Sequence, residues 1–194
     1  IGVSYLLQNA ALLIWGAEPK VYTPVIEGTL KLLGGKLSVS YISILTVIVC
    51  VVIMIVLTIF TSRSKTGKAM RACSEDKDAA QLMGINVNRT ISITFAIGSA
   101  LAAIAGVLLC SSYPTLVPTT GSMPGIKAFT AAVFGGIGSI PGAFLGGILL
   151  GVIESFAKAY ISTQLSNSIV FAVLIIVLLV RPAGLLGKYV PEKV

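Results

Sequence analysis

Ionisable side chains are scarce in the apolar stretches of this sequence, so the few that occur there are the first candidates for chemistry. Glu154 and Lys158 lie four residues apart in the stretch 143–160, and Lys127 stands at the start of the stretch 126–135. On a helix, an acid four residues before a base forms a favourable pair. A local pair, with Lys158 reaching to the outer membrane interface, is one interpretation. Contact with a zwitterionic substrate or a partner helix is the other.

Other kinds of chemistry find little support in the residue types present. A proton-coupled carrier needs a relay of Asp, Glu or His at mid-membrane, but Glu154 is the single acid in these stretches and the sequence has no His. Cysteines occur in an odd number and at wide spacing, at positions Cys50, Cys73 and Cys110. Neither a metal site nor a disulfide framework is therefore expected.

The glycine-rich segments lack the composition of a phosphate-binding loop. Gly34-Gly35-Lys36 is followed by Leu37, where such a loop needs Ser or Thr. The segment 135–138, Gly-Gly-Ile-Gly, has no following Lys and is typical of a helix break. We therefore expect that this chain is not an enzyme, does not hydrolyse ATP and binds no cofactor itself.

The overall composition indicates that the lipid bilayer is the solvent of this chain. Hydrophobic residues make up 56% of it and charged residues 11%, whereas soluble proteins carry about 25% charged residues. A soluble fold with so few charges would expose large apolar patches. The net charge of +7 then bears on membrane orientation rather than on nucleic-acid binding. Because the sequence begins with Ile1 inside an apolar run, we expect a fragment that lacks leading spans.

Long apolar runs predict an all-α polytopic membrane protein, a helical bundle that forms one transmembrane domain over 1–194. A span takes about 20 apolar residues, and the candidate runs are 1–17, 41–61, 91–112, 143–160 and 166–181. Lys and Arg collect in the loop 62–89 and in the tail that starts at Arg181. Both segments are placed in the cytoplasm, and with them the C-terminus. The mixed segment 18–40 is expected outside, as a turn or hairpin.

The alternation of spans requires the chain to return inward between residues 113 and 142. The helical piece available there, 126–135, has about ten residues, too few to span at ~1.5 Å per residue. We predict a broken or re-entrant element inside the bundle, since bare backbone at membrane depth is tolerated only within protein or at a cavity. A helix N-terminus near Gly125 would favour a carboxylate. The groups expected along the substrate path are Thr130, Gly135, Gly136, Gly138, Ser139 and Glu154.

Small residues recur at every fourth position on two of the predicted spans. One set is Gly98, Ala102 and Gly106, and the other is Ala143, Gly147 and Gly151. In lipid, such faces let two helices approach closely. Simple packing is one interpretation, and a surface that slides between inward-facing and outward-facing states is the other.

The charged loop 62–89 has the composition of a short cytoplasmic helix. Gly67 and Gly84 bracket the helical stretch, and Gly84 is suited to end it. Arg71 and Glu75 lie one turn apart on its polar side. Two interpretations fit these residues: a solvated loop that merely fixes topology, and a small helix that fits a groove on another protein.

This loop resembles the cytoplasmic coupling loop of bacterial ABC-importer permeases, which has an alanine-containing acidic turn and a glycine several residues later. The residues in those roles are Glu75, Asp76, Ala79, Ala80, Gly84 and Ile85. Beyond the loop, the chain is similar to the permease subunit of the high-affinity branched-chain amino acid transporter. The similarity runs through IGVSYLLQN, GKAMRACSEDKDAAQLMGIN, KAFTAAVFGGIGSIPGAFLGG and LLVRPAGLLG.

The resemblance implies an ATP-driven importer of leucine, isoleucine or valine in the bacterial inner membrane. It implies lipid around the chain and three kinds of protein partner: a second homologous permease, two ATP-binding subunits that hold ATP and Mg²⁺, and an external, periplasmic substrate-binding protein. Coupling to the ATPase subunits would run through the loop, with Gly67 and Arg71 among its residues. Permeases for urea, short amides or other small solutes, and a self-sufficient secondary carrier, are the alternatives.

Overall fold

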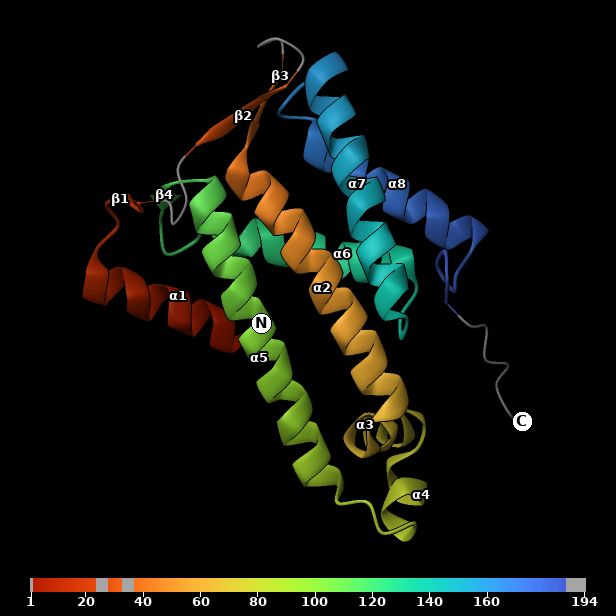
Figure 1. Ribbon diagram of the computed structural model, residues 1–194. Helices are drawn as coiled ribbons and strands as arrows, with labels where there is room; N and C mark the ends of the chain where they lie inside the picture. The colour runs from red at the N-terminus through yellow and green to blue at the C-terminus, as the bar shows by residue number, and fades with distance from the viewer. Residues whose placement is uncertain (1, 24–27, 33–36, 188–194) are drawn as a thin grey trace. The chain divides into compact units, whose positions relative to one another are not determined.

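Runs of Ile, Val, Leu and Ala fold into helices over most of the chain in the computed structural model, which describes residues 2–23, 28–32 and 37–187 (Figure 1). The turn expected at Gly34-Gly35 and the charged end of the tail lie outside these residues. In chain order, the elements are α1 (Gly2–Trp15), β1 (Lys20–Val21), β2 (Thr29–Leu32), β3 (Leu37–Ser40), α2 (Tyr41–Arg63), α3 (Lys65–Glu75), α4 (Lys77–Leu82), α5 (Val87–Ser112), β4 (Thr115–Leu116), α6 (Ser122–Gly135), α7 (Ile140–Tyr160) and α8 (Ser166–Val180).

Three of the described helices, α2, α5 and α7, are long and apolar enough to cross a membrane. They have 23, 26 and 21 residues. At ~1.5 Å per residue their lengths are about 31–39 Å, against a hydrocarbon core of about 30 Å. The apolar helices α1 and α8 are shorter, with 14 and 15 residues, and α6 has 14. The prediction of an all-α membrane protein is confirmed.

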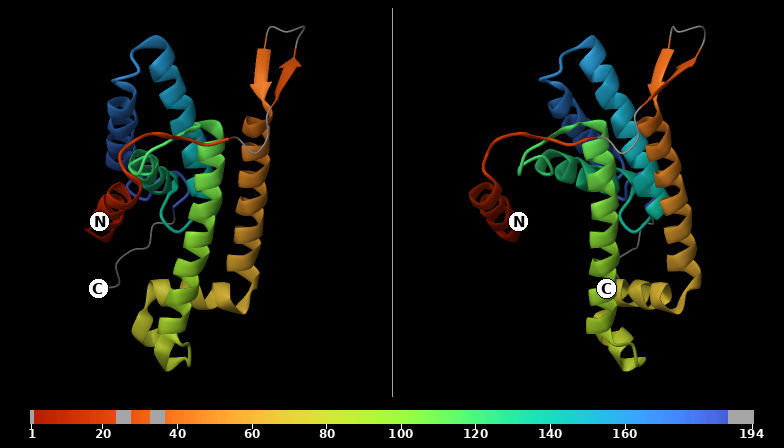
Figure 2. Two further views of the ribbon diagram at one scale, coloured as in Figure 1. Left: turned by 90° about the vertical axis from the view of Figure 1, so that its left-hand side faces the viewer. Right: turned by 60° about the vertical axis from the view of Figure 1, so that its left-hand side comes forward.

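The chain divides into two units, Ile1–Gly121 and Ser122–Val194. In the first unit, α2 and α5 run antiparallel and in contact, and α3 lies across one end of the pair (Figures 1 and 2). At the other end, β2 and β3 pair as an antiparallel hairpin that leads into α2. The hairpin predicted within 18–40 is thus present. A second antiparallel pair, β1 with β4, ties the ends of α1 and α5 together.

The second unit is built from α6, α7 and α8. Its buried core consists of Phe134, Leu150 and Val170, one from each helix. Helix α6 lies across α7 instead of running alongside it, as the two views of Figure 2 show. With 14 residues, α6 is about 21 Å long, shorter than the hydrocarbon core of about 30 Å.

Glycines let the backbones of α6 and α7 touch. A Cβ on Gly146 would overlap the carbonyl oxygen of Ala131, and a Cβ on Gly142 would lie 2.5 Å from the carbonyl oxygen of Gly135. The closely packed face therefore contains Gly142 and Gly146, one residue away from the expected face at Ala143, Gly147 and Gly151. At Gly147, the nearest atom to an added Cβ is 3.9 Å away, an ordinary contact distance.

The two neighbouring glycines of α7 provide a matched test of this contact. We expect Gly146→Ala to force the backbones apart, at about 1–3 kcal/mol for an overpacked site, and to lower the unfolding temperature by roughly 2–12 °C. Gly147→Ala should leave it unchanged or slightly higher. The measurement is thermal unfolding of the full-length protein in detergent, and equal shifts for both variants would contradict the packing.

Candidate functional site

The charged segment 62–89 leaves α2 through a sharp corner that depends on Gly67. Ser64 ends α2 and caps α3, and its hydroxyl oxygen accepts a hydrogen bond from the Gly67 N–H at 2.8 Å. A Cβ on Gly67 would lie 2.5 Å from the Cα of Thr61. The sequence indicated that Gly67 brackets the helix, and this prediction was wrong. Gly67 lies in the first turn of α3, where its missing side chain lets α3 turn across the end of α2.

The segment contains two helices instead of the single helix expected. The break is at Asp76, whose backbone is extended, with φ −154° and ψ 116°. Its carboxylate accepts hydrogen bonds from the N–H groups of Asp78 and Ala79 at 2.9 and 3.0 Å. An Asp that caps the N-terminus of a helix in this way stabilises it by about 1 kcal/mol. Asp76 thus ends α3 and starts α4.

Helix α4 ends at Leu82, and Gly84 two residues later stops it, as the sequence predicted. Gly84 has φ 81°, a conformation that costs other residues energy. Its N–H donates to the carbonyl of Gln81 at 3.0 Å, and the N–H of Ile85 donates to the carbonyl of Ala80 at 3.1 Å. These two bonds make a Schellman motif, which fixes the direction in which the chain enters α5.

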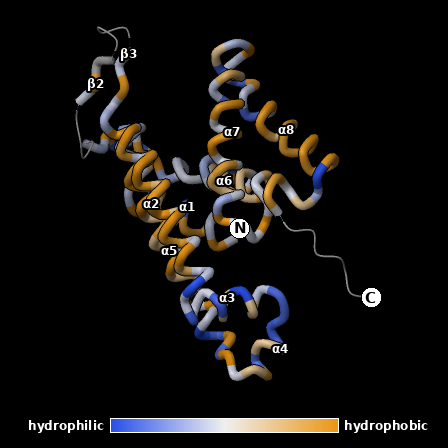
Figure 3. The backbone as a smooth tube through the Cα atoms, turned by 45° about the vertical axis from the view of Figure 1, so that its right-hand side comes forward, coloured by the Kyte–Doolittle hydropathy of each residue, from blue (hydrophilic) through white to orange (hydrophobic). Residues whose placement is uncertain are grey.

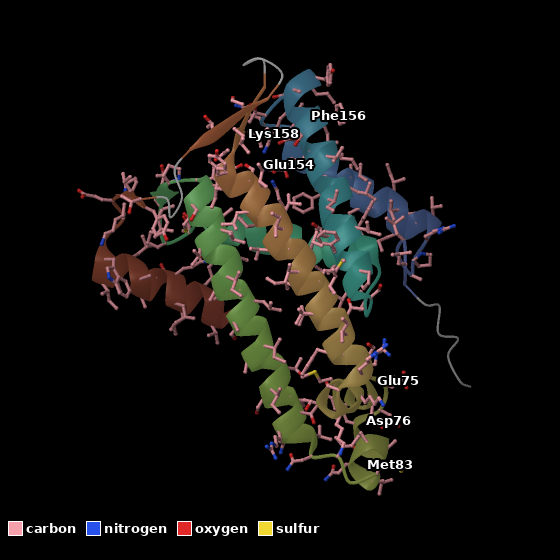
Figure 4. The ribbon with its side chains drawn as sticks, in the orientation of Figure 1. Glu75, Asp76, Met83, Glu154, Phe156 and Lys158 are labelled. Carbon is pink, nitrogen blue, oxygen red and sulfur yellow. The ribbon has the colours of Figure 1, made fainter. Side chains whose placement is uncertain are left out.

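The outward surface of α3 and α4 is polar with an apolar tip. The side chains of Cys73 and Ala80 are buried, whereas Glu75 and Asp76 are exposed (Figure 4). Helices α3 and α4 form the hydrophilic end of the first unit, in contrast to the hydrophobic α2 and α5 (Figure 3). At the tip, Leu82 and Met83 are 89% and 84% exposed. Two adjacent apolar side chains on a charged segment mark a surface suited to contact with another protein.

Some of the other predicted coupling residues are buried and some are exposed. Arg71, Ala79 and Gly84 are exposed, Ile85 is half-buried, and Gly67 and Ala80 are buried. The buried members shape the corner and the inner face of the helix pair. The sequence shows that Leu82 and Met83 are apolar, but it did not predict that they are exposed, because their exposure depends on where α4 ends.

In the second unit, a three-residue ion cluster joins α6 to α7. Glu154 Oε1 accepts hydrogen bonds from Lys127 Nζ at 2.7 Å and from Lys158 Nζ at 2.5 Å. The carboxylate is largely covered, with 16% of its side-chain surface exposed. Local spacing predicted the Glu154–Lys158 pair. It carried no signal for Lys127, which lies 27 residues from Glu154.

Most of the other residues expected along the substrate path have structural roles. The buried Thr130 donates its hydroxyl to the Lys127 carbonyl at 2.7 Å, and Ser139 caps α7 by accepting from Gly142 N–H at 3.1 Å. Gly136 and Gly138 have φ values of 110° and 89°, which produce the break between α6 and α7. Gly135 belongs to the helix contact described above. Their place on a substrate path stays a prediction.

The segment after α8 covers the open end of α6. The N–H groups of Leu185 and Leu186 donate to the carbonyls of Phe134 and Gly135 at 3.0 and 2.9 Å. Gly184 packs so closely that a Cβ on it would lie 2.6 Å from the Cα of Gly136. The start of the break at Gly135 and Gly136 is therefore buried, whereas Ile137 and Gly138 are exposed. This contact joins segments about 50 residues apart, which spacing alone does not reveal.

Comparison with known proteins decides the family. Residues 1–179 match the family described as "Branched-chain amino acid transport system / permease component". The chain belongs to this permease family. Family membership together with three apolar helices of membrane-spanning length makes it a membrane protein.

Individual relatives agree with the permease family. The high-affinity branched-chain amino acid transport system permease protein BraD of Pseudomonas aeruginosa is 47% identical over the whole chain, and LivH of Escherichia coli is 45% identical over the whole chain. The chain covers 64% of each of these relatives, slightly under two thirds. The xylose transport system permease protein XylH of Escherichia coli is 30% identical over 70% of the chain and 30% of its own length. No solved structure matches the chain.

The cap at Asp76 can be tested without reference to function. Asp76→Ala removes the acceptor for two N–H groups, so we expect amide hydrogen exchange over 77–83 to become about fivefold faster, equivalent to about 1 kcal/mol. Asp76→Asn keeps an acceptor oxygen and serves as the matched control. Exchange that is equally slow in Asp76→Ala would show that the cap does not hold α4.

The ion cluster predicts a non-additive pair of substitutions. Glu154→Gln leaves the ammonium groups of Lys127 and Lys158 without their shared carboxylate, so we expect the unfolding temperature in detergent to fall by several degrees, roughly 3–6 °C. Adding Lys127→Met removes one of the repelling charges and should restore part of the loss. Strictly additive losses would argue against the cluster.

Proposed function

We propose that the chain is the membrane-spanning permease subunit of an ATP-driven importer that carries branched-chain amino acids across the bacterial inner membrane. Its family and the names of relatives at 45–47% identity support this function. The chain itself has no predicted nucleotide site, so the energy would come from ATP-binding partner subunits.

The observation that carries the coupling proposal is the α3–α4 pair with its exposed apolar tip. Two short helices meet at the Asp76 cap, stand at one end of α2 and α5, and present Leu82 and Met83 at 89% and 84% exposure. Apolar side chains at the centre of a polar rim are typical of protein interfaces. We infer that this tip enters a groove on an ATP-binding subunit, with Arg71, Glu75 and Asp76 around it.

The same proposal includes a membrane orientation and the remaining partners. Lys and Arg concentrated in 62–89 favour a cytoplasmic position for α3 and α4, and the tail after Arg181 would put the C-terminus on the same side. A second homologous permease, two ATP-binding subunits with ATP and Mg²⁺, and a periplasmic substrate-binding protein would complete the importer. The substrate path would pass the break between α6 and α7 at Gly138 and the ion cluster at Glu154.

A different cargo is the alternative that one observation supports. The similarity to XylH, named for xylose transport, extends over 70% of the chain. A helix pair that contacts an ATPase carries no information about the transported solute. The cargo is therefore tested separately from the coupling.

The coupling proposal predicts that Leu82→Glu with Met83→Glu prevents docking. Two carboxylates buried at the centre of an interface are costly without partners, so we expect the ATP-binding subunits to stop co-purifying with the full-length permease. ATP-dependent leucine uptake in proteoliposomes should fall by at least about tenfold, equivalent to 1.4 kcal/mol of lost affinity.

The matched control is the exchange Leu82→Met with Met83→Leu, which keeps both apolar side chains. It should preserve complex formation and uptake. Undiminished co-purification with the double Glu variant contradicts docking through the tip. Uptake by the wild type that is driven by an ion gradient without ATP contradicts an ATP-driven importer, and competition by xylose instead of leucine contradicts the proposed cargo.

A further inference from the structure

A mainly apolar cavity of about 550 Å³ lies in the first unit, at the end of α5 far from α3 and α4. Its walls include Trp15 at the end of α1, Leu109 near the end of α5, and Leu116 and Val117 beyond it. A volume of this size is within the range of sites for small molecules, about 300–1,000 Å³.

Strand pairing assembles this cavity from segments far apart in the sequence. Lys20 pairs with Leu116 and Val21 with Thr115 in the β1–β4 ladder, and the Tyr22 N–H donates to the Pro114 carbonyl at 2.7 Å. The end of α1 is thereby fixed beside the end of α5. Because the paired strands lie far apart in the sequence, local patterns did not predict the cavity.

Two opposite charges stand in the lining of this apolar cavity. Glu18 supplies a carboxylate and Lys20 an ammonium group. Both side chains are exposed, and within the described part of the chain neither forms an ion pair. Because one charge of each sign is available beside apolar walls, the cavity complements a small zwitterion with an aliphatic side chain. An inorganic ion or a fully apolar ligand would leave part of this lining without a counterpart.

We propose that this cavity is a binding site for the free branched-chain amino acid, with Lys20 facing the substrate carboxylate, Glu18 facing its ammonium group, and Trp15, Leu109 and Val117 around the side chain. The proposal rests on the importer function proposed above and names a site for it. In the proposed orientation the cavity is at the outer end of α5, where a substrate arriving from outside would first meet the permease.

Gly106 offers a way to fill the cavity without disturbing the helix. It lines the cavity, and no described atom outside the neighbouring backbone of α5 lies within 4 Å of a Cβ placed on it. Gly98 has equally open surroundings on the same helix but does not line the cavity. Leucine is a better helix former than glycine, so Gly106→Leu and Gly98→Leu form a matched pair that differs in occupancy of the cavity.

Cys110 also lines the cavity and is a free thiol, so it can report on the ligand directly. The experiment uses the full-length permease with its partner subunits in nanodiscs, with all other cysteines replaced by Ser. Leucine should slow modification of Cys110 by a methanethiosulfonate reagent about fivefold. Protection should be lost in Gly106→Leu and retained in Gly98→Leu.

Leucine analogues test the two charges separately. The concentration that half-protects Cys110 in the wild type should be at least tenfold lower for leucine than for 4-methylpentanoate, which lacks the ammonium group, or for 3-methylbutylamine, which lacks the carboxylate. Glu18→Gln should abolish the preference over 4-methylpentanoate, and Lys20→Met the preference over 3-methylbutylamine. Glu18→Asp and Lys20→Arg keep the charges and should keep both preferences.

The outcomes distinguish this site from the importer function itself. No protection of Cys110 by leucine, or equal protection in Gly106→Leu and Gly98→Leu, overturns the site. Preferences that Glu18→Gln and Lys20→Met leave unchanged overturn the roles of the two charges. ATP-dependent leucine uptake by the wild type, measured in the same preparation, decides the importer function independently.

Discussion

The structure depends on the requirement that backbone N–H and C=O groups be paired where the surroundings are apolar. Regular helices meet this requirement by themselves, and the break between α6 and α7 does not. There, the carbonyls of Phe134 and Gly135 accept from Leu185 and Leu186 at 3.0 and 2.9 Å. The segment after α8 thus supplies what a continuous helix would have supplied. Among the described residues, no buried side-chain polar atom lacks a hydrogen-bond partner.

The pairing of these backbone carbonyls determines which residues can surround the break. For the tail to reach the end of α6, Gly136 and Gly184 must approach to distances that exclude a Cβ. The contact of α6 with α7 has the same requirement at Gly146. Interactions between helices in lipid rely on close packing rather than on exclusion of water. Close packing therefore explains Gly136, Gly146 and Gly184, and the ion cluster at Glu154 adds a polar link between α6 and α7.

Features that depend on neighbouring residues could be predicted from the sequence. Charge-free runs predicted α2 and α5, the glycine at position 84 predicted where the helical part of 62–89 ends, and four-residue spacing predicted the Glu154–Lys158 pair. Features that depend on backbone geometry or on contacts between distant residues could not be predicted. The Asp76 cap divided a helix that composition alone made continuous. The contact of Lys127 with Glu154 and the cavity beside β4 both join residues that the chain separates widely.

Helix α5 connects the two proposed sites of the first unit. Near its start, Thr90 is buried and α3 packs against the helix, and near its end Leu109 and Cys110 line the cavity. Its 26 residues form one continuous helix about 39 Å long. A continuous hydrogen-bonded helix moves as a rigid element, so a displacement of α3 and α4 by a docked ATPase would reach the cavity without an intervening hinge.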